Sequence, residues 1–319
     1  MRVFQVHRPD DQIAYFCTMH KLKPTIEIDP SAGFCSGVKR AIKSAENLLK
    51  SGGEVSCLGE IVHNENEMER LTGLGMRIIG PDDYEIPDPG ARVLIRAHGV
   101  TPETYKELEE RLLSVTDATC PVVLRLQQNV RKASVEVFAR QGTIVIFGKQ
   151  GHPEVIGLQG NAKGNVRVLS HPDDISGAAL TTPLHVFAQT TSNAASYKKF
   201  CEAITARFPD AASRGEVMLH QTICGQVSKR EPALEKFARD HDVVIFVTGS
   251  GSSNGKYLSE YCRSVNARTL VVTGSGQLEK KWFAGAARIG VTGATSTPAW
   301  LMEEVASAIE TMTSEASCT

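Results

Sequence analysis

PSAGFCSGVKRAI, residues 30–42, contains a pattern that two later stretches of the chain repeat. These are TDATCPVVLRL, residues 116–126, and HQTICGQVSKRE, residues 220–231. In all three, a turn or strand leads to a cysteine, and an amphipathic helix is predicted directly after it. The cysteines are Cys35, Cys120 and Cys224. Because helix N-termini carry free N–H groups and a positive dipole, we expect these thiols to have lowered pKa values.

The surrounding sequence repeats as well, with the three cysteines 85 and 104 residues apart. Each repeat reads strand, cysteine, helix, strand, polar turn, helix, short strand, strand, polar turn and helix. Alternating strands and helices predict parallel sheets covered by helices. The sequence therefore predicts an α/β fold of three similar domains, at residues 26–120, 121–222 and 223–319. Residues 1–25 are predicted to form an N-terminal tail.

The polar turns indicate a shared site. Ligands of parallel α/β sheets bind at the carboxyl ends of the strands, where these turns lie. Three units facing inward would gather the three thiols with ten polar side chains: His63, His98, His152, Glu154, Thr190, Thr191, Ser252, Ser253, Asn254 and Ser296. The alternative is a plain solenoid of α/β units whose serines and threonines only cap helices. That alternative does not explain histidines and cysteines at matched positions.

The charge and hydropathy of the sequence argue against nucleic acids and membranes as partners. Lys and Arg total 35 and Asp and Glu total 36, which gives a formal charge of -1. This balance argues against a broad nucleic-acid or acidic-membrane surface. No apolar run reaches the roughly 18 residues of a membrane span, and the first residues lack a secretion signal. We therefore expect a soluble, cytoplasmic protein without nucleic-acid or membrane partners.

The remaining cysteines are predicted to be ordinary thiols. The sequence contains no CxxC or CxxxCxxC pattern, which excludes a zinc ribbon, a thioredoxin motif and a local iron–sulfur signature. Five cysteines lie in unremarkable strand, helix or terminal contexts, namely Cys17, Cys57, Cys201, Cys262 and Cys318.

The combination of side chains suggests a particular chemistry. Three thiolates can hold three irons of a cubane cluster, which leaves the fourth iron free to bind a substrate oxygen. Histidines, hydroxyls, an amide and helix N-termini suit a phosphate or diphosphate. Glu154 in a closed pocket can donate a proton near neutral pH, while Thr190 or Thr191 holds a hydroxyl. These parts predict electron transfer to a bound phosphate ester, with protonation and loss of a hydroxyl.

Nucleotide binding is not supported. GSGSSNGK, residues 249–256, fails the phosphate-loop pattern because Tyr257 follows Lys256 where Ser or Thr is required. No GxGxxG follows a predicted strand and opens a helix, so a dinucleotide fingerprint is absent too.

Nine motifs in order resemble the 4-hydroxy-3-methylbut-2-enyl diphosphate reductase family, also called IspH or LytB. They are GFCSGVKRAI, GEIVHN, RAHGV, DATCPVV, GHPEV, QTT, TIC, SSN and GATSTP, spread over residues 26–311. The resemblance implies a trefoil of three α/β domains around one [4Fe-4S] cluster per chain. It implies reductive removal of the C4 hydroxyl, which yields isopentenyl and dimethylallyl diphosphate in the last step of the non-mevalonate (MEP) pathway.

The resemblance also assigns roles to residues. By position, Cys35, Cys120 and Cys224 match the cluster ligands, and one iron has no protein ligand. Glu154 matches the proton donor, and Thr190 matches the threonine near the substrate hydroxyl, with Thr191 beside it. The diphosphate-binding set corresponds to His63, His98, His152, Ser252, Ser253, Asn254 and Ser296. The implied electron donor is a small carrier such as ferredoxin or flavodoxin.

The sequence departs from the family pattern in three places. GQVSKRE follows Cys224 where many members have ATxxRQ, and Ser36 follows Cys35 where Ala or Phe is usual. Both changes are expected to alter packing beside the cluster and not its ligands. About two dozen residues precede Thr25, so either Met19 is the true start or these residues form a loose tail.

Two other functions remain open at this point. A non-redox iron–sulfur hydratase or dehydratase would share the open iron but need no external electrons. A cluster-bearing sensor or binding protein would have no obvious use for Glu154 and the two threonines.

Overall fold

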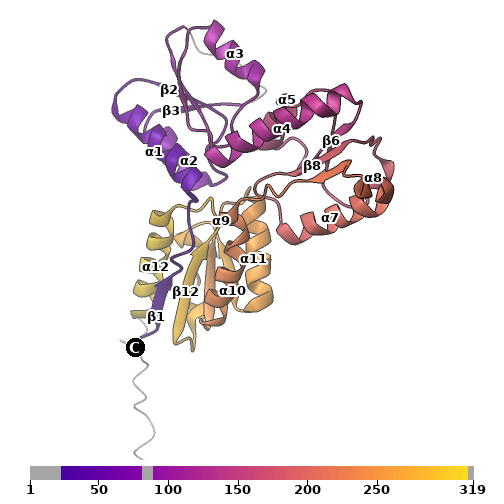
Figure 1. Ribbon diagram of the computed structural model, residues 1–319. Coiled ribbons are helices and arrows are strands. Elements are labelled where there is room, and N and C mark those ends of the chain that lie inside the picture. The colour runs from indigo at the N-terminus through magenta and orange to yellow at the C-terminus, as the bar shows by residue number, and fades with distance from the viewer. Residues whose placement is uncertain (1–22, 81–88, 315–319) are drawn as a thin grey trace, which may run out of the picture.

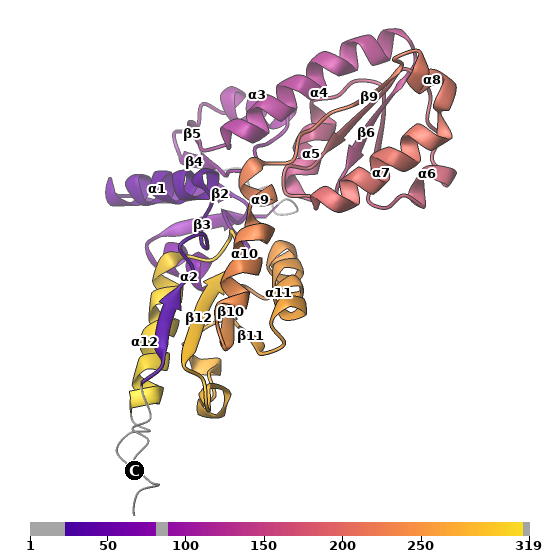
Figure 2. The ribbon, with the colours of Figure 1, turned by 60° about the horizontal axis from the view of Figure 1, so that its bottom comes forward.

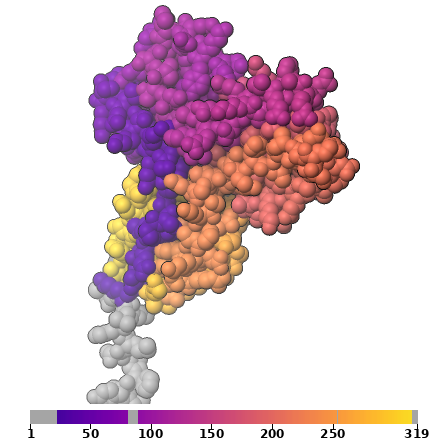
Figure 3. Space-filling model, in the orientation of Figure 1, coloured from indigo at the N-terminus to yellow at the C-terminus, as the bar shows by residue number. Residues whose placement is uncertain are grey.

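The computed structural model describes residues 23–80 and 89–314. They form three α/β lobes that meet at one junction, which the ribbon and the space-filling views both show (Figures 1 and 3). Each lobe contains one four-stranded sheet, and every pair of neighbouring strands is parallel. The predicted α/β class and trefoil arrangement are therefore confirmed.

The first lobe has the strand order β3-β2-β4-β5. Its elements are α1 (Ser36–Lys50), β2 (Val55–Leu58), α2 (Glu65–Gly73), β3 (Met76–Ile79), β4 (Arg92–Ile95), α3 (Pro102–Glu110) and β5 (Ser114–Asp117).

The second lobe repeats this order as β7-β6-β8-β9. Its elements are α4 (Pro121–Ala139), β6 (Thr143–Phe147), α5 (Pro153–Gly160), β7 (Asn165–Leu169), α6 (Asp174–Gly177), β8 (Leu184–Ala188), α7 (Ala194–Arg207), α8 (Pro209–Ser213) and β9 (Val217–Leu219).

The third lobe has the equivalent order β11-β10-β12-β1. It comprises β1 (Thr25–Ile28), α9 (Gly225–Ser228), α10 (Arg230–Arg239), β10 (Val243–Val247), α11 (Ser253–Val265), β11 (Thr269–Val272), β12 (Arg288–Gly293) and α12 (Ala299–Ser314). Two short 3-10 helices, Ser275–Gln277 and Lys280–Phe283, lie between β11 and β12.

Strand β1 corrects the predicted domain boundary at residue 26. It pairs with β12, Thr25 opposite Arg288, and so belongs to the third sheet, not to the first. The strands before the other two cysteines behave in the same way, because β5 and β9 complete the sheets of the preceding lobes. The first strand of each sequence repeat therefore belongs to the sheet of another lobe. For the first repeat, this strand is β1, which joins the sheet of the third lobe. For the rest of the chain we propose domain boundaries near residues 120 and 222. Of the tail predicted over residues 1–25, residues 1–22 lie outside the described part of the structure, and Thr25 belongs to β1.

The helix after Cys224 also differs from the prediction. A single amphipathic helix was expected there, but α9 ends at Ser228 and α10 starts at Arg230. Pro232 accounts for the break, because a proline has no N–H to donate and its ring collides with the carbonyl four residues earlier.

The centre of each sheet is apolar on both faces. Strands β2, β6 and β10 are buried along their whole length, as parallel strands covered by helices must be. Cys57, Cys201 and Cys262 lie buried in β2, α7 and α11, in agreement with their interpretation as ordinary thiols. Cys17 and Cys318 lie outside the described residues. Within the described ranges, no helix is both long and apolar enough to cross a membrane.

Candidate active site

The three repeated cysteines lie where their helices begin. Cys35, Cys120 and Cys224 are the N-cap residues of α1, α4 and α9, and none of their side chains is used to cap the helix. All three are partly accessible to solvent. Figure 2 shows the starts of these helices converging where the lobes meet. The thiols are therefore free to bind a common ligand.

Two of the thiols lie beside Gly37. A Cβ atom at this glycine would lie 2.8 Å from Cys120 Sγ and 3.9 Å from Cys35 Sγ. The first contact is closer than real Cβ atoms tolerate, so a side chain here would displace the Cys120 thiol. Gly37 thus keeps space open between the sulfurs.

The predicted lowering of the thiol pKa is wrong for Cys35. Burial raises its pKa, and the neighbouring Cys120 and Cys224 thiols raise it further, while the amides of Gly37 and Val38 oppose the shift. The helix N-terminus does favour the thiolate as expected, but desolvation outweighs it. A positively charged ligand such as iron would compensate for the burial of the Cys35 thiolate.

Among the described residues, no three His, Cys, Asp or Glu side chains are placed to hold a single metal ion. A polynuclear cluster requires a different arrangement of ligands. Each thiolate binds its own iron, so the three sulfurs need not converge on a single metal position. The donor set of three cysteines and the gap beside Gly37 fit such a cluster.

Two of the cysteines are tied to the polar turns through the backbone. The N–H of Cys120 donates to the carbonyl of Ala97, next to His98, at 2.9 Å. The N–H of Cys224 donates to the carbonyl of Thr190, also at 2.9 Å. The strand-end turns and the helix starts therefore form one connected rim.

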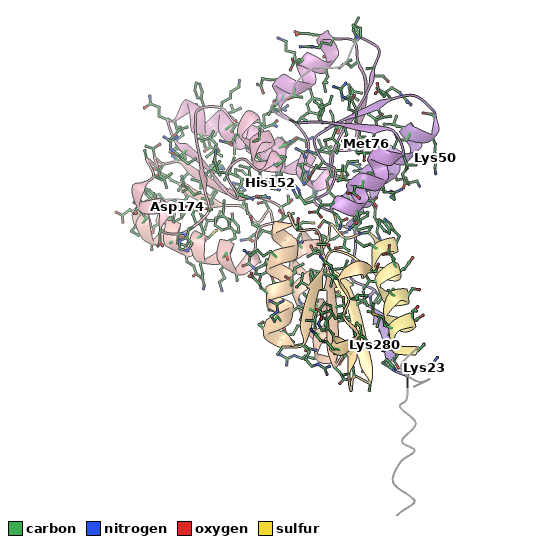
Figure 4. All side chains as sticks on the ribbon, turned by 180° about the vertical axis from the view of Figure 1, so that it is seen from behind. Lys23, Lys50, Met76, His152, Asp174 and Lys280 are labelled. Atoms are coloured by element: carbon green, nitrogen blue, oxygen red, sulfur yellow. The ribbon has the colours of Figure 1, made fainter. Side chains whose placement is uncertain are left out.

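Three histidines from two lobes gather at this rim. Ring centroids lie 5.3 Å apart for His98 and His152, 6.2 Å for His63 and His98, and 6.4 Å for His63 and His152. Figure 4 shows His152 at the inner edge of the second lobe, where the lobes meet. The structure thus brings together the three histidines that the sequence predicted.

Burial keeps His98 and His152 neutral. Burial and the nearby charges of Arg96 and the other histidines hold the pKa of His98 well below its usual value. Burial, followed by His63 and Arg96, lowers the pKa of His152 to about 4. His152 Nδ1 accepts a hydrogen bond from the Glu154 N–H at 3.1 Å, so its proton resides on Nε2 as a free donor. His98 Nδ1 is buried without a hydrogen-bond partner in the described ranges, which a ligand could supply.

Glu154 and Thr190 form a buried pair. The Thr190 N–H donates to Glu154 Oε1 at 2.6 Å, and the Thr190 hydroxyl donates to Oε2 at 2.8 Å. Only 1% of Glu154 and 4% of Thr190 are exposed. Burial raises the pKa of Glu154 although both hydrogen bonds oppose this effect. This carboxyl therefore keeps a proton to a higher pH than an ordinary glutamate.

The third lobe contributes hydroxyls and an amide. Ser252 Oγ lies 3.1 Å from Ser296 Oγ, and Asn254 Nδ2 donates to Thr295 Oγ1 at 2.9 Å. This turn meets the first lobe at Gly249, where a Cβ would lie 2.6 Å from the carbonyl of His63. Ser253 is the first residue of α11, but its side chain lies outside the described part of the structure.

Thr191 differs from its neighbour because it is exposed. Its hydroxyl accepts a hydrogen bond from Gln189 Nε2 at 2.9 Å, and Gln189 Oε1 accepts one from the Lys149 N–H. The sequence reasoning missed Gln189 and Thr295, which hold Thr191 and Asn254. Gln189 lies in the motif QTT and Thr295 in the motif GATSTP, so their positions in these motifs could have indicated that they belong to the site.

A cavity of about 780 Å³ lies elsewhere, between α7 and the end of β9. Tyr197, Cys201, Leu219 and Ile223 line it, together with residues further along α7. It contains none of the predicted site residues.

Comparison with known proteins identifies a family to which this chain is similar. A family model described as LytB protein matches residues 26–310. A Parabacteroides distasonis protein named 4-hydroxy-3-methylbut-2-enyl diphosphate reductase is 41% identical over 282 residues, covering 88% of this chain and 96% of that protein. A Porphyromonas gingivalis protein of the same name is 40% identical over 298 residues, covering 90% of this chain and 99% of that protein.

Two solved structures are similar in architecture. One is described as (E)-4-hydroxy-3-methyl-but-2-enyl diphosphate reductase, the terminal enzyme of the non-mevalonate pathway; it aligns with a TM-score of 0.68 and 34% identity over 90% of this chain and 99% of its own. The other is described as the E-1-hydroxy-2-methyl-but-2-enyl-4-diphosphate reductase from Plasmodium falciparum. It aligns with a TM-score of 0.74 and 25% sequence identity, and the alignment covers 88% of this chain and 86% of that protein.

Proposed function

The chain belongs to the LytB family, and from this premise we propose that it is a 4-hydroxy-3-methylbut-2-enyl diphosphate reductase. The reaction breaks the C4–O bond of the substrate, forms a C–H bond and releases water. It consumes two electrons and two protons and yields isopentenyl or dimethylallyl diphosphate. The observation that carries this proposal is the junction of the lobes, which combines three thiols, a histidine cluster and a buried carboxyl.

LytB proteins are iron–sulfur enzymes. We propose that Cys35, Cys120 and Cys224 hold one [4Fe-4S] cluster per chain, with one iron lacking a protein ligand. When bound, such a cluster supplies single electrons and an open iron that acts as a Lewis acid. The three uncapped thiols and the space beside Gly37 support this assignment.

The diphosphate is proposed to bind the histidines and the third-lobe turn. This set comprises His63, His98, His152, Ser252, Ser253, Asn254 and Ser296. Neutral imidazoles and hydroxyls can donate hydrogen bonds to phosphate oxygens, and the Nε2–H of His152 is such a donor. A bound anion would also raise the pKa of His98 and His152, because its negative charge opposes the burial and the nearby positive charges that now lower them.

Glu154 is proposed to supply the proton that leaves with the substrate hydroxyl. Its raised pKa keeps the proton available, and Thr190 orients both carboxyl oxygens. Thr190 is also proposed to contact the substrate hydroxyl, because its side chain donates to Glu154 and its carbonyl accepts the N–H of Cys224. Thr191 is proposed to support this turn through Gln189.

The electrons are proposed to come from a small protein carrier such as ferredoxin or flavodoxin, in the cytoplasm. The near-zero formal charge is consistent with a small anionic substrate held by local groups, without nucleic-acid or membrane partners.

Anaerobic reconstitution with iron and sulfide tests this function. The loaded protein is mixed with 4-hydroxy-3-methylbut-2-enyl diphosphate and reduced methyl viologen, and the products are identified by mass spectrometry. We expect both isoprenoid diphosphates, formed only when reductant is present. Turnover without reductant would favour the hydratase or dehydratase, and an intact, reducible cluster without any product would favour the sensor.

A further inference from the structure

A cation lies four or five residues after each of the three cysteines. Lys39 lies four residues after Cys35, Arg125 five after Cys120 and Lys229 five after Cys224. All three are exposed. Because they lie about one helical turn beyond their cysteines, the internal repeat places one positive charge near each thiol.

Opposite charges do not offset these cations locally. The first turns of α1, α4 and α9 contain no acidic residue. The ion pairs among the described residues do not include any of the three cations. Glu231, the nearest carboxylate along the chain to Lys229, accepts hydrogen bonds from Asn193 and Tyr257. The positive charges of Lys39, Arg125 and Lys229 are therefore exposed to solvent and available to an acidic partner.

Hydrogen bonds join the three helix starts into one surface. The Ser36 N–H donates to Gln226 Oε1 at 3.1 Å, and Gln226 Nε2 donates to Ser36 Oγ at 3.0 Å. These are the positions at which the sequence departs from the family pattern, and the structure pairs them beside two thiols. The Arg40 guanidinium donates to the carbonyls of Ala118 and Thr119, which links α1 to the loop before Cys120.

An apolar side chain lies on the same surface. Val122, two residues after Cys120, is 42% exposed in the first turn of α4. Interfaces of electron-transfer proteins are small, and complementary charges raise their rate of association. The three thiols at these helix starts are partly accessible, so a cluster that they held would be open to electron transfer from this side of the protein.

We propose that Lys39, Arg40, Val122, Arg125 and Lys229 form the docking surface for a small acidic electron-carrier protein. We call this set the carrier surface. The inference rests on the proposed function, because only a redox enzyme needs such a partner. The formal charge of the whole chain is -1, so attraction of an acidic protein must come from a local patch. Each encounter transfers one electron from the reduced carrier to the cluster, and two encounters supply one turnover.

The test measures cluster reduction without substrate. A triple variant, Lys39→Gln, Arg125→Gln and Lys229→Gln, removes three charges without touching a cysteine. Reduced acidic ferredoxin is mixed with loaded protein at low salt in a stopped-flow instrument, and cluster bleaching is followed by absorbance. We expect the second-order rate constant to fall by roughly tenfold or more. In the wild type it should fall as ionic strength rises.

Two controls separate docking from other effects. Lys280→Gln changes an exposed lysine in the third lobe, away from the junction (Figure 4), and should leave the rate unchanged. Reduction by dithionite should remain within about twofold in the triple variant, because a small reductant needs no docking surface. Equal ferredoxin rates in wild type and triple variant would overturn the proposal, and so would a parallel loss with dithionite. A failure of the proposed function looks different, since the cluster would be reduced normally but substrate would not turn over.

Discussion

Arg230→Met tests the buried ion pair that connects three loops of the site. Arg230 Nη1 donates to Asp29 Oδ2 at 2.8 Å, and its Nη2 donates to Thr292 Oγ1 at 2.7 Å and to the Gly293 carbonyl at 2.9 Å. Asp29 and Arg230 are 3% and 4% exposed. The network joins the loop that leads to Cys35, the start of α10 after Cys224 and the end of β12 before Ser296.

The expected loss of stability is large because one charge remains buried without its partner. Methionine has a similar length, but it leaves the Asp29 carboxylate uncompensated. Breaking a buried pair in this way costs about 3–5 kcal/mol. Asp29→Asn combined with Arg230→Met should recover part of this loss, since the double variant buries no unpaired charge.

The assay can report on the third lobe and on its contact with the first, because Trp300 Nε1 also donates to Glu67 Oε2 in α2 at 2.7 Å. Both tryptophans of the chain, Trp282 and Trp300, pack against the core of that lobe. Urea unfolding of the metal-free protein, followed by tryptophan fluorescence, therefore measures the unfolding free energy where the network lies. Arg239→Met is the matched control in the same helix, because Arg239 is exposed and its ion pair within residues 23–80 and 89–314 is the surface pair with Glu235. A loss for Arg230→Met no larger than for this control would refute the reasoning.

The same pair predicts a dependence on pH. Burial would raise the pKa of Asp29, but the Arg230 charge and hydrogen bonds from Ser31 and Thr292 outweigh it and hold the pKa below its usual value. A lowered pKa contributes stability that is complete at neutral pH and is lost as pH falls below about 4. In Arg230→Met this loss on acidification should disappear, since burial then acts on Asp29 without its counter-charge.

Three further predictions concern the site itself. Alanine at any of the three repeated cysteines should abolish the visible absorbance of the reconstituted protein, whereas Cys262→Ala should keep it; the reverse pattern would show that the wrong thiols were assigned. Gly37→Ala should lower the iron bound per chain while leaving the metal-free protein folded by circular dichroism, because the added Cβ would lie 2.8 Å from Cys120 Sγ; full iron content would contradict this geometry. Glu154→Gln should keep the cluster and reduce turnover at least about a hundredfold. In the wild type, activity should fall as pH rises through the raised pKa of Glu154, and unchanged turnover in the variant would remove its role as proton donor.

Much of the site could be predicted from the sequence because its signals are local. A cysteine before an amphipathic pattern indicates a helix start, and the structure places all three cysteines at N-caps. Likewise, polar turns that follow apolar strands lie at one edge of a parallel sheet, which is why three histidines far apart in sequence come together. The repeat made these local signals more informative, since the same order occurs three times.

The sequence alone thus determined the α/β class, the three cysteines and the polar set at the strand ends, because these depend on periodicity, capping and order along the chain. Tertiary structure decided which sheet accepts β1, since TIEI could pair at either edge and its partner β12 lies more than 250 residues away. It also decided the sign of the Cys35 pKa shift and the role of Arg230. Both depend on burial and on neighbours from distant segments, which no local pattern contains.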